Sequence, residues 1–193
     1  PGILAMAAIV VASNILVQYQ LWDGLLTWGA FSYPFAFLVT DLTNRLQGSA
    51  AARRVVLMGF AVGVVCSFTA AQLDLTTLRI AMGSGLAFLV AQLVDVGIFN
   101  RLRAGAWWRA PLVSTLVSST LDTVIFFSVA FAGVFTFIEP GVPTDWAQDM
   151  VPLLTIGPDV HLWVSLAAAD WCIKIALAIV ALVPFRIVIA RLA

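Results

Sequence analysis

Six long apolar stretches constrain this chain more than any other feature of its sequence. A helix needs about 20 apolar residues to cross the roughly 30 Å hydrocarbon core of a bilayer. Six stretches are about that long or longer, and they run over residues 3–22, 28–46, 55–73, 78–100, 110–138 and 160–185. The chain is 62% hydrophobic and 10% charged, whereas soluble domains are about 25% charged. We therefore predict an all-α polytopic membrane protein in which residues 1–193 form a single transmembrane domain.

Two stretches carry further signals about helix geometry. The second is interrupted by Tyr33, Pro34 and Asp41, so we expect it to be kinked or partly unwound beside a cavity. The third carries Gly59 and Gly63, whose four-residue spacing is typical of closely packed membrane helices.

Positive and negative charges alternate from loop to loop. The loops after the second, fourth and sixth stretches hold arginines and no acid: Arg45, Arg53, Arg54, Arg101, Arg103, Arg109, Arg186 and Arg191. The opposite loops hold Asp23, Asp74, Glu139, Asp145, Asp149 and Asp159, with Arg79 as their one base. Short loops rich in arginine stay in the cytoplasm. Both termini are therefore expected on the cytoplasmic side, and six crossings agree with this because an even number places both ends on one side.

Apart from the charges assigned to loops above, five charged residues remain inside the apolar stretches: Asp41, Asp95, Asp122, Asp170 and Lys174. A charge near the bilayer centre costs at least about 2.5–3.5 kcal/mol, so such side chains usually face a protein interior or a wet cavity. Polar neighbours three or four residues away place each acid on one face of its helix. The sequence thus predicts a polar chamber inside the bundle.

The roles of these charges remain open at this stage. Asp170 and Lys174 are four residues apart and can form an ion pair or a proton relay, and Arg45 can satisfy Asp41. Asp122 lies roughly 20 Å from the cytoplasmic edge, thirteen residues beyond Arg109 at about 1.5 Å each. Lys174 cannot neutralise both deep acids, so the surplus carboxylate favours a cationic or donor-rich substrate, or a carried proton.

Several motifs resemble the vitamin-uptake-transporter-like family of queuosine-precursor transporters. They cover most of the chain in the family's order: Trp28-Gly29-Ala30-Phe31, Pro34, Thr40-Asp41-Leu42-Thr43, Gln92-Leu93-Val94-Asp95, Phe99-Asn100-Arg101-Leu102-Arg103, Trp107-Trp108, Ala110-Pro111, Ser114-Thr115-Leu116, Asp122-Thr123, Phe126-Phe127, Asp170, Cys172 and Lys174. One departure is the run Ser118-Ser119-Thr120, where family members carry an asparagine near Ser119.

The resemblance implies import of a 7-deazaguanine, the cyano or aminomethyl queuosine precursor, across a bacterial inner membrane. A carboxylate can accept the N1–H and 2-amino donors of a guanine-like edge together, and polar and aromatic side chains can serve its other edges and its faces. The expected substrate-binding residues are Asp122, Asp95, Gln92, Ser118, Ser119, Asn14, Phe31, Phe88, Trp163 and Trp171. Besides this small molecule and the lipid bilayer, a second copy of the chain or an energising protein is a possible partner.

The family is also similar in size and helix number to the substrate-binding subunits of energy-coupling-factor importers. An alternative function is therefore that of such a subunit for another heterocyclic vitamin, energised by a separate module. A carrier driven by a gradient or by metabolic trapping of its substrate is equally compatible with the sequence.

A remote alternative is an intramembrane serine protease. Ser84, within Gly83-Ser84-Gly85, and His161 open the fourth and sixth stretches near the outer face, and a nucleophile needs its base within hydrogen-bond reach. A Gly-Ser-Gly run is ordinary in membrane helices, so we expect no enzyme. With one histidine and no cluster of ligands, no metal site is expected either, nor any cofactor or nucleic-acid partner.

Overall fold

Seven α-helices and two short β-hairpins form the described part of the chain. The structure, a computed structural model, describes residues 1–21 and 24–192, so the expectations for Trp22 and Asp23 fall outside it. The helices are α1 (Gly2–Leu16), α2 (Gly29–Ser32), α3 (Pro34–Gln47), α4 (Ser49–Gln72), α5 (Leu78–Leu102), α6 (Arg109–Phe131) and α7 (Leu162–Leu192). The strands are β1 (Gln20–Leu21), β2 (Leu26–Thr27), β3 (Met150–Pro152) and β4 (Asp159–His161), and the 3-10 turns are η2 (Gly133–Ile138), η3 (Asp145–Gln148) and η4 (Leu153–Thr155).

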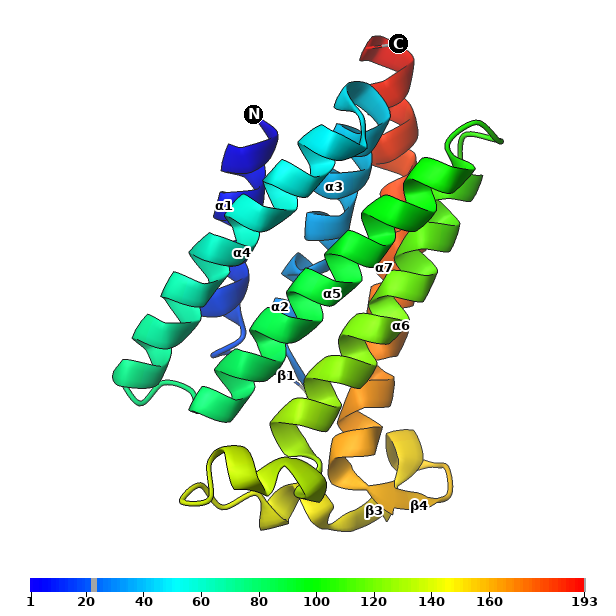
Figure 1. Cartoon of the computed structure of the whole chain (residues 1–193). Coiled ribbons are helices and arrows are strands. Elements are labelled where there is room, and N and C mark those ends of the chain that lie inside the picture. Colours follow the sequence, from blue (N-terminus) through cyan, green and yellow to red (C-terminus); the bar gives the residue numbers. More distant parts are fainter. Residues whose placement is uncertain (22–23, 193) are drawn as a thin grey trace.

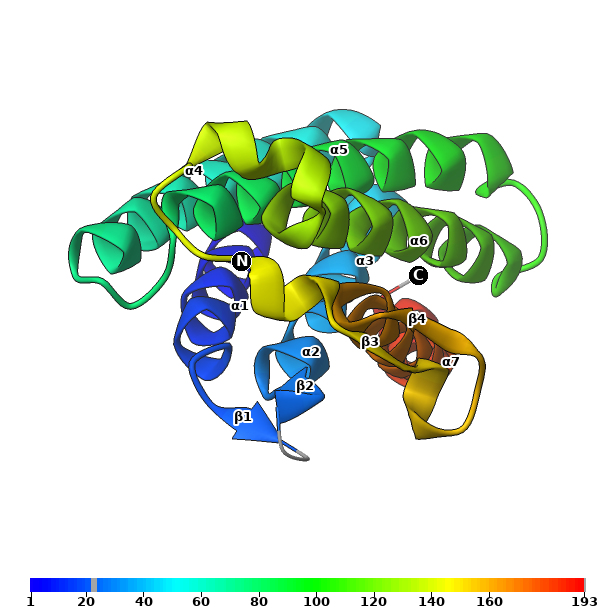
Figure 2. The ribbon, with the colours of Figure 1, turned by 90° about the horizontal axis from the view of Figure 1, so that it is seen from below.

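The long helices form two layers. Helices α4, α5 and α6 lie side by side in one layer, and α1, α3 and α7 cover it in the other (Figure 2). Helix α3 occupies the middle, where it contacts α4, α5, α6 and α7. Both chain ends lie at the same end of the bundle (Figure 1).

Four of these helices, α4 to α7, are long and apolar enough to cross a membrane. The first and second predicted stretches form shorter helices, α1 and the pair α2–α3. Large apolar side chains point outward along the long helices, among them Leu57, Val65, Phe68, Leu86, Val124, Val180, Val183 and Ile187. A bundle that exposes such side chains and buries polar ones is arranged for a bilayer rather than for water.

The second stretch is divided, as the sequence predicts. Helix α2 ends at Ser32, and α3 begins with Pro34 in its first turn. Proline has no backbone N–H to donate to the preceding turn, so the helical hydrogen bonds stop there. The side chain between the two helices, Tyr33, lines an internal pocket.

Two predicted stretches end earlier than expected. The first continues to residue 22 in the prediction, but α1 ends at Leu16 and a β1–β2 hairpin follows. The fifth continues to residue 138, but α6 ends at Phe131 because Ala132 adopts an extended conformation. Apolarity measures burial in lipid and does not distinguish a helix from the irregular chain that follows it.

A pair of reciprocal caps fixes the point where α6 ends. The buried Arg79, in the first turn of α5, donates to the carbonyl oxygens of Val129 (2.7 Å) and Ala132 at the end of α6. In return, Glu139 beyond α6 accepts from the backbone N–H groups of Leu78 (3.3 Å) and Arg79 (2.9 Å). A cation at a helix C-terminus and an anion at a helix N-terminus are each favourable. The α5–α6 pair is therefore joined at this end.

The α6–α7 segment, residues 132–161, is folded against the ends of both helices. Gln148 donates to the carbonyl oxygen of Phe131 (2.8 Å), and Trp146 packs edge-on against the Phe131 ring. Strands β3 and β4 pair through Met150 and His161 at the start of α7. The sequence analysis expected helices alone, so these hairpins are an addition to the predicted all-α fold.

The close packing predicted from Gly59 is present between α1 and α4. A Cβ at Gly59 would lie 2.5 Å from Met6 Cγ and 3.2 Å from Phe88 Cζ. Real Cβ atoms do not approach neighbours so closely, so α1 and α5 can reach α4 here because residue 59 has no side chain. Gly63 is the milder case, with Val10 Cγ1 at 3.3 Å.

Candidate functional site

A band of polar side chains is buried between the two helix layers. It consists of Thr40, Asp41, Thr43 and Asn44 on α3, Gln92 and Asp95 on α5, Ser114, Thr115, Ser118, Ser119, Asp122 and Thr123 on α6, and Lys174 on α7. Spacings of three and four residues put these groups on the inner face of each helix. The polar chamber predicted from the sequence is therefore present as a polar interior.

Lys174 lies at the centre of a charge cluster. Its Nζ is 2.6 Å from Asp122 Oδ2 and 2.6 Å from Asp170 Oδ2, and the second of these contacts joins residues four apart on α7. Thr123 joins the cluster by donating to Asp170 Oδ2 (3.0 Å), and its hydroxyl oxygen lies 3.3 Å from Nζ. The Tyr33 ring faces the ammonium with its centroid 5.5 Å away. One lysine thus serves two carboxylates that come from different helices.

Several buried polar atoms beside this cluster have no hydrogen-bond partner within the described residues. They include both carboxylate oxygens of Asp95, Asp122 Oδ1, Gln92 Nε2 and the hydroxyls of Ser118 and Ser119. Asp95 and Gln92 are completely buried. Buried polar atoms are normally satisfied because an orphaned one costs about 1–3 kcal/mol. A set of acceptors and donors in one region is what a polar ligand would use.

Helices α3 and α5 are held in a fixed parallel register beside these atoms. Thr40 donates to Gln92 Oε1 (2.6 Å), and Asn44 Nδ2 donates to the Val96 carbonyl oxygen (3.1 Å). Each bond joins residues 52 positions apart, so the two helices run in the same direction at this point. The register brings Asp41 and Asp95 to the α3–α5 contact.

The Asp41 carboxyl group is buried among hydroxyls and another acid. Ser114 and Thr115 of α6 donate to its two oxygens at 3.4 and 3.3 Å. Asp95, one residue before Val96, lies in the same α3–α5 contact and is completely buried. The described ion pairs all belong to Lys174, so this second pair of acids has no cation bound to it there.

The expected pairing of Asp41 with Arg45 is corrected by the structure. The Arg45 guanidinium extends toward the helix end and donates to the carbonyl oxygen of Arg103 (2.5 Å). A residue four positions further along α3 reaches the polar rim more easily than the interior, where no water would solvate its charge.

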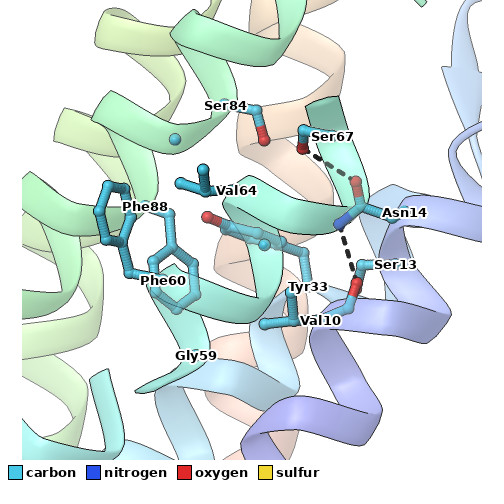
Figure 3. Close-up of a pocket in the computed structure, with 12 residues that line it drawn as sticks. Val10, Ser13, Asn14, Tyr33, Gly59, Phe60, Val64, Ser67, Ser84 and Phe88 are labelled. Atoms are coloured by element: carbon cyan, nitrogen blue, oxygen red, sulfur yellow. Dashed lines mark hydrogen bonds between the residues drawn. The ribbon is translucent and has the colours of Figure 1, made fainter. Parts of the chain in front are cut away.

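One internal pocket lies between α1, α4 and α5, next to Tyr33 (Figure 3). Asn14 belongs to its polar wall and accepts a hydrogen bond from Ser67 (3.1 Å). Phe88 supplies an aromatic wall and packs edge-on to Tyr33. Two of the predicted substrate-binding residues, Asn14 and Phe88, therefore line a common pocket.

A second pocket opens at the other end of the polar band, between α3, α6 and α7. Asp41 and Thr115 form its polar side, and Phe37, Leu182 and Phe185 lie on its apolar side. Both pockets are narrow, with room for ordered water rather than for a fused-ring base. The conformation described is thus closed around the polar band.

The other predicted aromatic residues lie apart from the polar band. Trp171 is 40% exposed, and its indole N–H donates to the exposed Thr120 (3.0 Å), so its ring lies on the outer surface of the bundle. Phe31 packs with Ala30 of α2 and Ala169 of α7. Trp163 is half-buried in the first turn of α7. The helical period around Asp170 could not distinguish an inward tryptophan at position 171 from an outward one.

Ser84 and His161 lie in different surroundings. Ser84 faces the pocket beside Tyr33, whereas His161 is exposed and its Nδ1 lies 2.8 Å from the Gln148 carbonyl oxygen. No hydrogen bond joins their side chains in the described ranges 1–21 and 24–192. The geometry required of a nucleophile and its base is not formed.

Tyr33 and Thr123 belong to the site but were not among the predicted site residues. Tyr33 touches both the charge cluster and the first pocket, and Thr123 bridges Asp170 and Lys174. The Pro34 interruption pointed to Tyr33, because irregular backbone within a membrane is tolerated beside cavities. The adjacent Asp122 pointed to Thr123, which the sequence alone could not orient.

With this geometry defined, comparison with known families is informative. Residues 27–189 match the family described as "Putative vitamin uptake transporter". The chain belongs to this family. The match includes α3 to α7 and hence the charge cluster and the polar band, while Asn14 on α1 precedes it.

Three bacterial transporters resemble the chain over much of its length. The "Queuosine precursor transporter" of Escherichia coli (strain K12) is 32% identical over 91% of this chain and 79% of its own length. The "Probable queuosine precursor transporter" of Haemophilus influenzae is 37% identical over 63% of this chain and 57% of its own length. A protein with the same description from Bacillus subtilis (strain 168) is 28% identical over 68% of each chain. No solved structure matches.

Proposed function

We propose that this protein imports a queuosine precursor, a 7-deazaguanine such as the cyano or aminomethyl compound. The transporters it resembles, including one aligned over 91% of the chain, carry queuosine precursors by name. The structural observation that supports this proposal is the buried set of unpartnered acceptors and donors around Asp95 and Asp122. A site built for such a base needs those groups.

The substrate edges and the free side-chain atoms are complementary. A guanine-like edge presents N1–H and 2-amino donors side by side, and a carboxylate with two free oxygens accepts both. Asp95 has two such oxygens, and Asp122 has one beyond its ion pair. Gln92 Nε2 is free to donate to the substrate carbonyl, and Ser118 and Ser119 can serve the pyrrole edge. Phe88 and Tyr33 offer aromatic faces near the band.

The closed conformation fits one state of an alternating cycle. The pocket at Asn14 and the pocket at Asp41 lie on opposite sides of the polar band, as entry and exit routes would. Helix α3 forms a wall of the second pocket, and Tyr33 at its start lines the first. We place the moving contact at the α2–α3 break, where the missing hydrogen bond of Pro34 lowers the cost of bending.

We further propose six crossings with both termini in the cytoplasm of a bacterium, the protein residing in the inner membrane. The common position of the two chain ends supports an even number of crossings (Figure 1). The arginine-rich loops after α3, α5 and α7 support the cytoplasmic assignment.

Uptake of labelled precursor by cells unable to synthesise it tests the function. Cells producing the wild-type protein should accumulate label, and Asp122→Asn should lower the rate about tenfold or more, the cost of losing a hydrogen bond to a charged group. The matched control is Asp145→Asn, because Asp145 is an exposed acid of the α6–α7 segment. Wild-type uptake no higher than in cells lacking the protein would refute the proposal, provided the protein reaches the membrane.

One more variant distinguishes the protease alternative from the proposed transporter. Ser84→Ala would abolish peptide cleavage by a serine protease, whereas import requires no nucleophile at this position. Retained uptake in Ser84→Ala cells is the result expected here.

A further inference from the structure

The Asp41–Asp95 pair is the part of the polar band that Lys174 does not serve. Asp41 is 2% exposed and Asp95 is 0% exposed. The two α3–α5 hydrogen bonds described above hold these acids at the helix contact. Both Asp95 oxygens lack a donor among the described residues. The pair is thus two acids in one buried place.

The charged groups on the surrounding helices are engaged elsewhere or exposed. Lys174 of α7 binds Asp122 and Asp170, and Arg45 of α3 binds the Arg103 carbonyl oxygen. Helix α1 carries no ionisable side chain. The exposed bases on the packed helices are Arg53 and Arg54 of α4, Arg101 of α5, Arg109 of α6, and Arg186 and Arg191 of α7. The α6 side chains that bind this pair are the hydroxyls of Ser114 and Thr115.

Two neighbouring carboxyl groups without a cation cannot both be ionised in a buried site. The like charges repel at short range, and each lacks the hydration it would have in water. One proton shared between the two groups removes the repulsion and gives each acid a donor or an acceptor. In the closed conformation described here, where both acids are buried, the pair therefore holds a proton.

The proton also has a route to one side of the membrane. Asp41 lines the second pocket together with Thr115, at the arginine-rich end of α3 and α6. Asp95 is completely buried, three residues from Gln92 on the same face of α5, and the Gln92 Nε2 is also without a partner among the described residues. Asp41 thus faces the second pocket, and Asp95 faces the proposed substrate site.

We infer that Asp41 and Asp95 form a proton-binding site that couples import to proton entry, with one proton carried per substrate. This inference rests on the proposed function. Binding of the substrate N–H donors requires Asp95 as a carboxylate, which leaves the shared proton on Asp41. When the second pocket opens to the cytoplasm, water hydrates both carboxyl groups, and the substrate and the Asp41 proton leave together. The empty carrier returns in this hydrated form without the proton, and a new proton enters from outside in the next cycle. No other bond is made or broken.

Purified protein in liposomes, without any partner, tests the coupling. The probe is labelled 7-cyano-7-deazaguanine, with a pH-sensitive dye inside the vesicles. For one proton per substrate, a difference of one pH unit, acid outside, should sustain up to about tenfold accumulation, because each tenfold ratio corresponds to about 1.4 kcal/mol. Asp41→Asn should reduce the accumulation ratio to about one, and Asp145→Asn should keep the wild-type ratio.

The outcomes separate this inference from the proposed function. In one outcome, labelled precursor exchanges for unlabelled precursor at a rate that does not depend on the pH gradient, and the dye does not respond. This outcome overturns the coupling and leaves the proposed function intact. Absence of any exchange by folded wild-type protein overturns the function instead. Infrared spectroscopy then still decides the site: a protonated-carboxyl band present in the wild type and lost in Asp41→Asn supports it, and its absence from the wild type refutes it.

Discussion

Lys174 carries the one positive charge within the buried ion pairs described here, and it lies 2.6 Å from carboxylates on two helices. Its four-carbon stem is buried with it, at 4% exposure. An ammonium in this position compensates repulsion between Asp122 and Asp170, which otherwise would face one another in a medium that screens charge poorly. Removing it should be more harmful than removing either acid.

A double-mutant cycle on Lys174 and Asp122 measures this compensation. We expect Lys174→Met to lower the free energy of unfolding by about 3–5 kcal/mol, since it leaves buried carboxylates unpaired. Adding Asp122→Asn should restore part of the loss, because one of those charges is then removed. The measurement is chemical or thermal unfolding in a fixed detergent. A double variant as unstable as the sum of the two single variants would contradict the coupling.

At the scale of single residues, the sequence predicted which polar side chains face inward but not what each one contacts. The Asp170–Lys174 pair followed from a four-residue spacing on one helix. The Lys174–Asp122 contact joins residues 52 positions apart, and Arg45 binds a carbonyl oxygen 58 positions away. Such distant pairings depend on helix packing, which no local pattern specifies.

At the scale of elements, the α1–α4–α5 contact depends on one missing side chain. Gly59 has Met6 and Phe88 against it, whereas Gly97, also within a long helix, has no atom within 4 Å of the Cβ position. The two glycines therefore provide a matched pair for testing close approach.

We expect Gly59→Ala to be destabilising by about 1–3 kcal/mol, because the added methyl group overpacks Met6. Gly97→Ala should be neutral or stabilising, since alanine is favoured over glycine in a helix by about 1 kcal/mol. Thermal unfolding in detergent, followed by circular dichroism, checks both. If the two variants are equally stable, the α1–α4 contact accommodates the added methyl group with no loss of unfolding free energy, contrary to this prediction.

Helix boundaries also show what apolarity can and cannot predict. All six stretches contain helices, and the Pro34 interruption lies where α2 and α3 separate. Helix α6 nevertheless stops seven residues before the end of its stretch, at Phe131 instead of residue 138. The chain becomes extended at Ala132, where the Arg79 guanidinium of α5 binds the terminal carbonyl oxygens. A cap supplied by another helix has no signature in the stretch that it ends.

At the scale of the whole molecule, the feature to measure is which side of the membrane each loop lies on. With Cys66 and Cys172 replaced, Gly141→Cys in the α6–α7 segment and Ala104→Cys between α5 and α6 each provide a single exposed thiol. A membrane-impermeant thiol reagent applied to the intact inner membrane from outside should label Gly141→Cys only. After the membrane is opened, both variants should react. Labelling of Ala104→Cys before opening would contradict cytoplasmic termini and the six-crossing arrangement.

The account depends most on the buried carboxylates being the groups that hold the substrate base. Binding of labelled 7-cyano-7-deazaguanine to purified protein, measured by equilibrium dialysis, tests this directly. Asp95→Asn and Asp122→Asn should each weaken binding about tenfold or more, a loss of about 1.4 kcal/mol, while Asp145→Asn binds as the wild type does. Wild-type affinity in both Asp95→Asn and Asp122→Asn would contradict the account.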